Sequence, residues 1–322
     1  MSNIICCDWG SSRFRLYLFD TITRLIVKQF NSYDGILKIN DQWDVIDKSS
    51  KIAKSTYFLT YLFSQCEKLL GKPCFDLNIY VSGMASSTIG FHYVDYSDIP
   101  LDLDKNIPTV YKIFDKKNNC TIHIISGIRD NLEVVRGEEV QMLGLYEIYP
   151  NAFNIAMANV IFPGTHSKHF FIKNNQITSL KTYMTGELFH LMAHHSILKS
   201  SIKLPYSEMT TIESEIFRSG VMDSVDKNLF NKFFEVRTRS ISNQYSDLEN
   251  YYYLSGLCIG YELRELKYLE NTIFICAANP LFKFYKAGIQ ELNLGDKTRF
   301  IAPEIVENLV VYGHLRIFKN GN

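Results

Sequence analysis

Residues 4–30 read IICCDWGSSRFRLYLFDTITRLIVKQF, and residues 158–183 read ANVIFPGTHSKHFFIKNNQITSLKTY. Each stretch is predicted to contain a strand, a loop of small residues, a second strand, a polar turn and a third strand. The small residues in the two loops leave backbone N–H groups pointing outward with no side chain in the way. Such loops favour anions, and phosphate above all. Two copies in one chain indicate two half-molecules that grip a polyphosphate between them.

The size and charge of the chain limit its class. A chain of 322 residues is longer than one hydrophobic core usually sustains, so two domains are expected. Its composition, 46% hydrophobic and 21% charged, is ordinary for a globular protein. Basic and acidic residues both number 34, so no net charge draws the chain to nucleic acid or to an anionic membrane. Any bound anion must therefore be held by a local site.

The cysteines and the N-terminus predict a cytoplasmic protein. The seven cysteines form no Cys-x-x-Cys pair, and most lie in apolar runs, which is typical of buried reduced thiols. The sequence contains no run of about 18 apolar residues, so no membrane span is predicted. An acid at position 8, in a strand that begins the chain, argues against a secretory leader.

Mixed strands and helices in two similar halves predict an α/β fold with a central cleft. The boundary is expected near Tyr149, which gives domains at 1–148 and 149–322. Hydrophobic periodicity and turn residues predict further helices at 50–70, from about 137, and at 185–198, 248–269, 281–292 and 306–318. Further strands are expected at 77–81, 121–126 and 272–276.

Asp8 is the first candidate for chemistry. It ends an apolar strand and is followed at once by Gly10, Ser11 and Ser12. A carboxylate there can hold Mg²⁺ through water while the loop amides take phosphate oxygens. The alternative is an aspartate that turns a β-hairpin, which is common. The second loop, with Gly164 and Thr165 in the same setting, favours the phosphate site.

Glu138 and Glu139 lie at the entry of a predicted helix, where the helix dipole alone favours acids. In the functional interpretation, one carboxylate is the general base that accepts a proton from an attacking hydroxyl. Arg136 could pair with a glutamate or with the carboxylate of an acidic substrate. The spacing alone leaves the structural and functional interpretations equal.

Two other kinds of site are not supported. His190 and His194 stand four residues apart, but no third ligand lies at a recognisable spacing, so no zinc site is expected. The glycine-bearing loops fit neither the P-loop nor the Rossmann pattern.

Several segments together resemble one family. They are CDWGSS (7–12), VRGEEVQ (135–141), FPGTHSK (162–168), MTGEL (184–188) and LSGLCIG (254–260). Their order and spacing across nearly the whole chain closely resemble the 2-dehydro-3-deoxygalactonokinase family, and the combination is far more specific than any one segment.

The resemblance implies two actin-like (ribonuclease H-like) domains with a central nucleotide cleft that binds ATP with Mg²⁺. It implies phosphorylation of the 6-hydroxyl of 2-dehydro-3-deoxy-D-galactonate in galactonate breakdown. Under it Asp8 is the metal ligand, and Gly83, Met84 and Arg136 lie on the sugar-acid side. The residues implied for the nucleotide and its phosphates are Gly10, Ser11, Ser12, Gly164, Thr165, Ala277, Ala278 and Asn279.

The resemblance also suggests where the base lies. Related carbohydrate kinases carry a Gly-Asp-x-Gln segment, whose Asp is the base, ahead of the second phosphate loop. Here Gly137 to Gln141 occupies a similar place. Glu138 takes the Asp position if one residue is inserted, and Glu139 takes it directly otherwise, so both remain candidates.

Three departures from the family pattern are visible. Ser86 replaces the second Gly of Gly-Met-x-Gly-Ser, with Phe91 in place of the Trp that soon follows, and Ser126 replaces a Pro. The expected Ala-Gly-Ser/Thr adenosine loop reads AAN at 277–279. A Cβ at Ala278 could crowd a nucleotide or forbid a positive φ, which puts nucleotide affinity or base preference in question.

Other functions remain as alternatives. The nearest is a kinase for a related 2-keto-3-deoxy sugar acid. A nucleotide-binding regulator that has lost catalysis would account for the altered 277–279 loop. An actin-like polymer or chaperone ATPase is weaker, because it has no use for the Arg136 and Glu138–Glu139 cluster. The expected partners are ATP and a small sugar acid, and the oligomeric state stays open, with a homodimer as one option.

Overall fold

The computed structural model describes residues 3–50, 52–153, 155–205, 209–226 and 228–321. The chain forms two compact units, the first made of residues 1–156, 173–180 and 308–322, and the second of residues 157–172 and 181–307. These units differ from a division at 148/149 because residues 149–156 and two later segments group with the first unit. The boundary between two actin-like domains stays a prediction.

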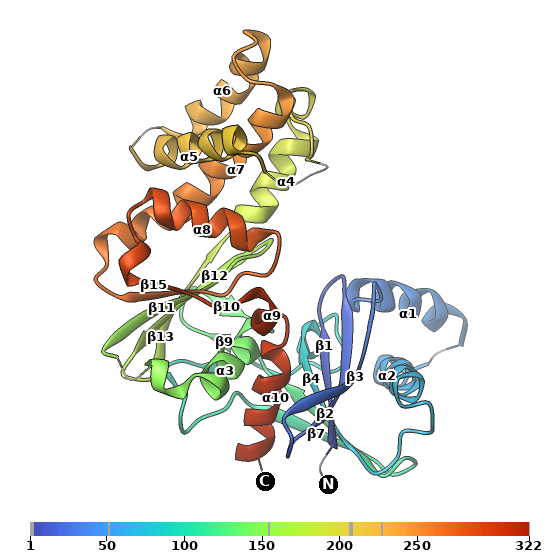
Figure 1. Cartoon of the computed structure of the whole chain (residues 1–322). Helices are drawn as coiled ribbons and strands as arrows, with labels where there is room; N and C mark the ends of the chain where they lie inside the picture. The colour runs from blue at the N-terminus through green and yellow to red at the C-terminus, as the bar shows by residue number, and fades with distance from the viewer. Residues whose placement is uncertain (1–2, 51, 154, 206–208, 227, 322) are drawn as a thin grey trace. The chain divides into compact units, whose positions relative to one another are not determined.

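The first unit is built on a mixed sheet with the strand order β3-β2-β1-β4-β8-β7 (Figure 1). Its central strands β1, β4 and β8 are parallel, whereas the hairpin partners β2, β3 and β7 are antiparallel. The bounds are β1 (Asn3–Trp9), β2 (Phe14–Asp20), β3 (Leu25–Ser32), β4 (Asn78–Gly83), β7 (Val110–Asp115) and β8 (Cys120–Ile125). Short strands are β5 (Ser97–Asp98), β6 (Leu101–Asp102), β9 (Ile128–Arg129) and β10 (Val134–Val135).

The helices of the first unit cover this sheet. They are α1 (Ile36–Ser50), α2 (Lys54–Leu70), α3 (Glu138–Ile148) and α10 (Leu309–Asn320), with 3₁₀ turns at Met84–Ser86 and Pro150–Phe153. Ile5, Cys7 and Trp9 of β1 pack in one core cluster with residues of α1 and α2. Every residue from Ile4 to Cys7 is buried, as expected for a central strand covered on both faces.

A second sheet has the same design, although residues 176–180 of its strand β13 group with the first unit. The strand order β13-β12-β11-β14-β15 repeats the order β3-β2-β1-β4-β8, and β11, β14 and β15 are again parallel. The bounds are β11 (Met157–Phe162), β12 (Ser167–Lys173), β13 (Gln176–Tyr183), β14 (Thr272–Ile275) and β15 (Thr298–Phe300). The duplicated strand pattern of the sequence is therefore confirmed at the level of topology.

Within its described residues, the second unit contains six helices. They are α4 (Thr185–His195), α5 (Thr211–Asp226), α6 (Leu229–Ile241), α7 (Asp247–Leu263), α8 (Leu281–Glu291) and α9 (Pro303–Val306). Short 3₁₀ segments are Ile197–Ser201, Arg264–Tyr268 and Gly295–Lys297. The core of this unit joins α5, α7 and α8 to β14, with Phe217, Tyr252 and Tyr285 among its fully buried side chains.

Several elements differ from the expectation. The sequence reasoning missed α1, β7 and β15, and the helix expected at 306–318 is two helices, α9 and α10. The helix expected at 185–198 ends at His195, where Ser196 adopts extended backbone. The helix expected at 50–70 is α2 from Lys54, and residue 51 lies outside the described residues.

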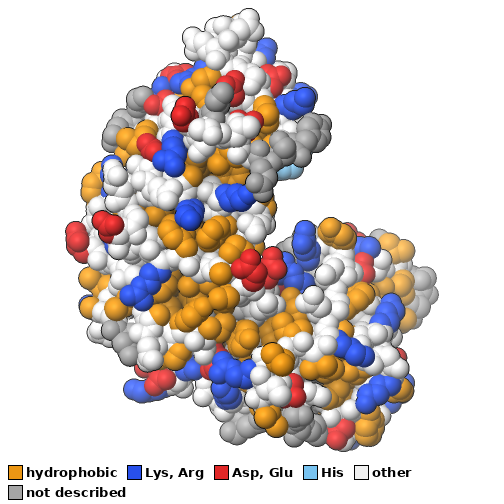
Figure 2. Space-filling model, in the orientation of Figure 1, with side chains coloured by type: hydrophobic (Ala, Val, Ile, Leu, Met, Phe, Trp, Pro, Cys, Tyr) orange, Lys and Arg blue, Asp and Glu red, His pale blue; other side chains and the backbone are white. Residues whose placement is uncertain are grey.

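The cysteines and the surface agree with the composition. All seven cysteines are free and buried. Basic and acidic side chains are interspersed on the face shown in Figure 2, in keeping with equal numbers of each. Among the described residues, no helix combines the length and the apolar character needed to cross a membrane.

Candidate active site

The first glycine-serine loop is a tight hairpin between β1 and β2. Its ends are fixed because Trp9 lies opposite Phe14, and the backbone N–H of Gly10 donates to the carbonyl of Arg13 at 2.9 Å. The start of α1 supports the loop from outside, since Ile36 donates its N–H to the carbonyl of Gly10 at 2.9 Å.

The amides of this loop remain available. Ser11 and Ser12 are exposed. Within the described residues, their backbone N–H groups have no hydrogen-bond partner in the chain. Unused amides on a rigid hairpin are suited to an anion.

Asp8 lies beside this loop, near the end of β1. Its side chain is 16% exposed, and its Oδ2 accepts a hydrogen bond from Arg15 Nη1 at 2.9 Å. Burial raises the pKa of Asp8, and the charge of Arg15 opposes that rise. The ion pair with Arg15 therefore engages only the Oδ2 oxygen of this carboxylate.

Gly83 and Gly137 bring two further segments to Asp8. Gly83 ends β4, lies opposite Trp9, and has a φ of +82° that disfavours any other residue. A Cβ at Gly83 would lie 2.8 Å from the carbonyl oxygen of Trp9 and 3.4 Å from Asp8 Oδ1. Gly137, with a φ of +113°, lies so close that its own Cβ would be 3.5 Å from the Cα of Gly83. The ends of β1 and β4 and the start of α3 therefore meet.

Glu138 and Glu139 begin α3 in different surroundings. Glu139 is fully buried, and its Oε2 accepts the backbone N–H of Gly137 at 2.6 Å while its Oε1 has no partner. Burial, with the nearby charge of Glu138, raises the pKa of Glu139 to about 8. Glu138 is half-buried and keeps part of its surface open to solvent.

Arg136 binds the chain itself. Its Nη1 donates to the carbonyl of Ser86 at 2.7 Å and to the Ser86 hydroxyl, and its Nη2 donates to the carbonyl of Val94 at 3.2 Å. The guanidinium also lies over the ring of Tyr96, 4.2 Å from its centre. Ser86, where the family pattern has Gly, is thus a partner of Arg136. The segment that begins with half-buried Met84 is fixed by these contacts, and a substrate-binding role for Arg136 stays a prediction.

In the second loop, between β11 and β12, the space beside the Cα of Gly164 is empty. A Cβ at Gly164 would meet no atom within 4 Å, and Thr165 is exposed. No neighbouring atom explains a glycine here, so the open space is available to a ligand that approaches the backbone.

The N-terminus of α4 packs directly against this loop. Glu187 donates its N–H to the carbonyl of Thr165 at 3.0 Å, and its Oε2 lies 2.5 Å from His166 Nε2. A Cβ at Gly186 would lie 2.7 Å from the carbonyl oxygen of Gly164, so only glycine permits this approach. The sequence reasoning gave His166 and Glu187 no role, although both lie in family segments.

The 277–279 loop follows the neighbouring strand of the same sheet. Ile161 and Ile275 are paired in parallel strands, and Cys276 donates its N–H to the carbonyl of Ile161 at 2.8 Å. Ala277 is buried, Ala278 half-buried and Asn279 exposed. None of the three has a positive φ, so Ala278 occupies no conformation that requires glycine. Gly164–Thr165 and Ala277–Asn279 therefore lie at one edge of the sheet.

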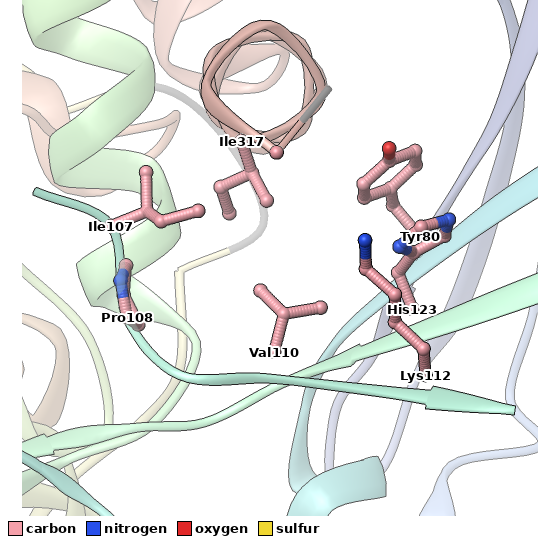
Figure 3. A pocket seen from close by; sticks show the side chains of 8 residues that line it. Tyr80, Ile107, Pro108, Val110, Lys112, His123 and Ile317 are labelled. Atoms are coloured by element: carbon pink, nitrogen blue, oxygen red, sulfur yellow. The ribbon is translucent and has the colours of Figure 1, made fainter.

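Two pockets lie away from these loops. One in the first unit, with a volume of about 210 Å³, is lined by Tyr80, Lys112, His123 and apolar side chains (Figure 3). The rings of Tyr80 and His123 stack 4.3 Å apart, and burial lowers the pKa of His123 to about 4, so it is neutral at pH 7. The other, of about 610 Å³, lies among α4, α6 and α7. None of the candidate site residues lines either pocket, although Leu188, the last residue of the MTGEL segment, lines the second.

A protein metal cage is absent from the described residues. No group of three or more His, Cys, Asp or Glu side chains there is arranged to hold a metal ion. Asp8 alone can still serve Mg²⁺, because this ion is usually held by one or two carboxylates together with water and substrate phosphates.

Known proteins resemble this chain over nearly its whole length. It is 26% identical over 296 residues to the 2-dehydro-3-deoxygalactonokinase of Escherichia coli K12, covering 89% of each chain. It is also 26% identical over 269 residues to the probable 2-dehydro-3-deoxygalactonokinase DgoK1 of Rhizobium meliloti, covering 80% of this chain and 78% of the relative.

A solved structure shares the fold. It is a Sinorhizobium meliloti protein assigned as a 2-dehydro-3-deoxygalactonokinase, with a TM-score of 0.78 at 22% identity, covering 98% of this chain and 97% of that one. The sequence pattern of the 2-keto-3-deoxy-galactonokinase family matches residues 8–308. The resemblance drawn from the sequence segments is confirmed, and the chain belongs to the 2-keto-3-deoxy-galactonokinase family.

Proposed function

We propose that this protein transfers the γ-phosphoryl group of ATP to the 6-hydroxyl of 2-dehydro-3-deoxy-D-galactonate. The observation that carries the proposal is the meeting of Asp8, Gly83 and Gly137, which brings three family segments that are far apart in the sequence to one strand edge. The family and the names of the two relatives supply the substrate class.

The phosphates of ATP would be bound by backbone amides. Ser11 and Ser12 offer N–H groups without partners in the described chain, and the loop at Gly164 leaves its backbone open. The exposed Thr165 adds a hydroxyl. Ala277 to Asn279, at the edge of the same sheet as Gly164, would contact the adenosine.

Asp8 would hold the Mg²⁺ that accompanies ATP. Its Oδ2 is engaged by Arg15, and its Oδ1 faces the space beside Gly83. When bound, Mg²⁺ neutralises the β- and γ-phosphate oxygens. The part of Asp8 is to place that charge beside the first phosphate loop. Calorimetry tests this role: Asp8→Ala should abolish Mg²⁺-dependent ATP binding, and undiminished binding would refute it.

Glu138 is the proposed general base. A base must reach the hydroxyl whose proton it takes, and Glu138 is half-buried whereas Glu139 is fully enclosed. The carboxylate of Glu139 accepts the N–H of Gly137, the residue immediately before Glu138. Glu139 is therefore a positioning residue, which holds the turn from which Glu138 projects.

The sugar acid would bind beside Gly83 and Met84. Arg136 supports this segment through Ser86 and Val94, and it would act on the substrate through that support. Arg13, exposed in the first loop with its guanidinium 5.4 Å from the centre of the Tyr33 ring, is a candidate partner for the carboxylate of the acid. The seven buried, free thiols support a cytoplasmic location.

The proposal is tested by coupled measurement of ADP release with Mg-ATP over a panel of 2-keto-3-deoxy sugar acids. We expect acid-dependent release, with the highest kcat/KM for the galactonate derivative. A higher kcat/KM for the gluconate epimer would assign the related kinase instead. Mg-ATP binding without release for any acid would favour a regulator, and would contradict the kinase.

A further inference from the structure

Glu262, on α7 in the second unit, is a fully buried acid that no step of the proposed reaction uses. Burial of an ionised carboxylate costs free energy unless hydrogen bonds or opposite charges compensate it. Among the described residues no lysine or arginine forms an ion pair with it, and the one basic side chain that contacts it is His169, with Nε2 2.9 Å from Glu262 Oε1. The free-energy cost of burying this carboxylate must therefore be compensated by its hydrogen bonds.

Four donors converge on the two oxygens of Glu262. Oε1 accepts from Ser167 Oγ at 2.7 Å and from His169 Nε2 at 2.9 Å. Oε2 accepts from Tyr285 OH at 2.7 Å and from the Thr185 hydroxyl. An ionised carboxylate has about four acceptor positions, so this one is filled. Burial raises the pKa of Glu262, but the hydrogen bonds from its neighbours outweigh burial and the pKa lies below its ordinary value.

The donors come from the elements that form the second phosphate loop. Ser167 is the first residue of β12, directly after the loop, and Thr185 is the first residue of α4. The start of α4 is in turn bonded to the loop through Glu187 and Thr165. Tyr285 comes from α8, the helix that follows the 277–279 loop. One buried side chain thus connects both chain segments that meet at the phosphate loop.

We propose that Glu262 is a positioning residue that fixes the second phosphate loop and the N-terminus of α4 for nucleotide binding. A hydrophobic residue in its place would leave four donors without this acceptor, three of them buried (Ser167, His169 and Tyr285), so the loop would lose its defined geometry. The inference rests on the proposed function, because it assigns the loop to the phosphates of ATP.

The test is steady-state kinetics of Glu262→Gln and Tyr285→Phe, with Glu265→Gln as the control. Glu265 lies three residues further on, but it is exposed and pairs with Lys181. We expect KM for ATP to rise about tenfold or more in Glu262→Gln and several-fold in Tyr285→Phe, with KM for the sugar acid unchanged in both. The control should keep both values.

A merely structural role gives a different result. Loss of folded enzyme would lower the apparent kcat and leave both KM values unchanged, which would overturn the proposal. Tyr285→Phe keeps the test available if Glu262→Gln does not fold, because it removes one donor and leaves the acid in place.

A binding measurement distinguishes failure of the proposed kinase function from failure of the role proposed for Glu262. If the wild-type protein phosphorylates no sugar acid, the proposed function fails. Calorimetric titration with a non-hydrolysable ATP analogue and Mg²⁺ then still tests Glu262. Weaker binding by Glu262→Gln and Tyr285→Phe than by Glu265→Gln would support the positioning role, and equal binding by all three, or no binding by the wild type, would overturn it.

Discussion

Glu138 and Glu139 are adjacent in the sequence, but the fold places their carboxylates in different surroundings. Glu139 turns into the protein and bonds to the amide of Gly137, whereas Glu138 stays half-buried. Both acids lie in the first turn of α3, where the helix dipole favours them equally. Neither propensity nor spacing separates the two, and only the packing around α3 does.

Glu138→Gln should lower kcat by about 10²-fold or more while the affinity for ATP is preserved, because the amide cannot accept the proton of the substrate hydroxyl. Single-turnover kinetics and calorimetry measure the two quantities. Glu67→Gln, an exposed acid of α2, is the control and should be unchanged. Wild-type turnover by Glu138→Gln would place the base elsewhere.

Glu139 predicts a pH dependence of stability. Its pKa is about 8 in the folded protein against an ordinary value of 4.5, so between these values the folded state holds more proton than the unfolded state. The stability from this group is present below pH 4.5 and is lost as the pH rises through 8. Thermal melts of Glu139→Gln should therefore show a smaller fall in Tm from about pH 5 to 8.5 than the wild type. Glu67→Gln should keep the wild-type slope, and an equal slope in Glu139→Gln would contradict the assignment.

At the scale of elements, the contact between the N-terminus of α4 and the loop at Gly164 positions the second proposed phosphate loop. The strands β11 and β12 around this loop could be predicted from the sequence, because apolar runs and turn residues mark them. The contact between α4 and the loop could not be predicted from the sequence, because it joins residues about twenty positions apart. It also depends on the missing Cβ of Gly186. The two family segments were visible as strings, but nothing in the strings says that they touch.

Gly186→Ala should disturb this contact specifically. Its Cβ would lie 2.7 Å from the carbonyl oxygen of Gly164, so the loop must move, and KM for ATP should rise on the order of tenfold, which corresponds to about 1.4 kcal/mol. Gly295→Ala is the matched control, because a Cβ there meets nothing within 4 Å. Equal KM values for the two variants would remove the loop from the nucleotide site.

At the scale of the whole molecule, the two sheets repeat one strand order. The duplication could be predicted because hairpins are local and their turns are marked in the sequence. Strands β7 and β15 could not be predicted from the sequence, because β7 is a largely exposed edge strand and β15 has only three residues. The grouping of residues 308–322 with the first unit depends on long-range packing of α10, which no local pattern reveals.

The burial of all seven thiols gives a test of the fold as a whole. Each cysteine is at most 6% exposed, so a thiol reagent such as DTNB should label none of them rapidly in the native protein. In guanidinium chloride all seven should react. Rapid labelling of the native protein would show that at least one of the two cores is packed differently.

Transfer of phosphate to the 6-hydroxyl is tested by identifying the phosphorylated product. The protein is incubated with Mg-ATP and 2-dehydro-3-deoxy-D-galactonate, and the product is examined by ³¹P NMR with proton correlation. We expect one new phosphomonoester signal coupled to the two C6 protons, and loss of that signal with Glu138→Gln. ADP and inorganic phosphate with no new phosphomonoester, or an ester at another carbon, would contradict this transfer.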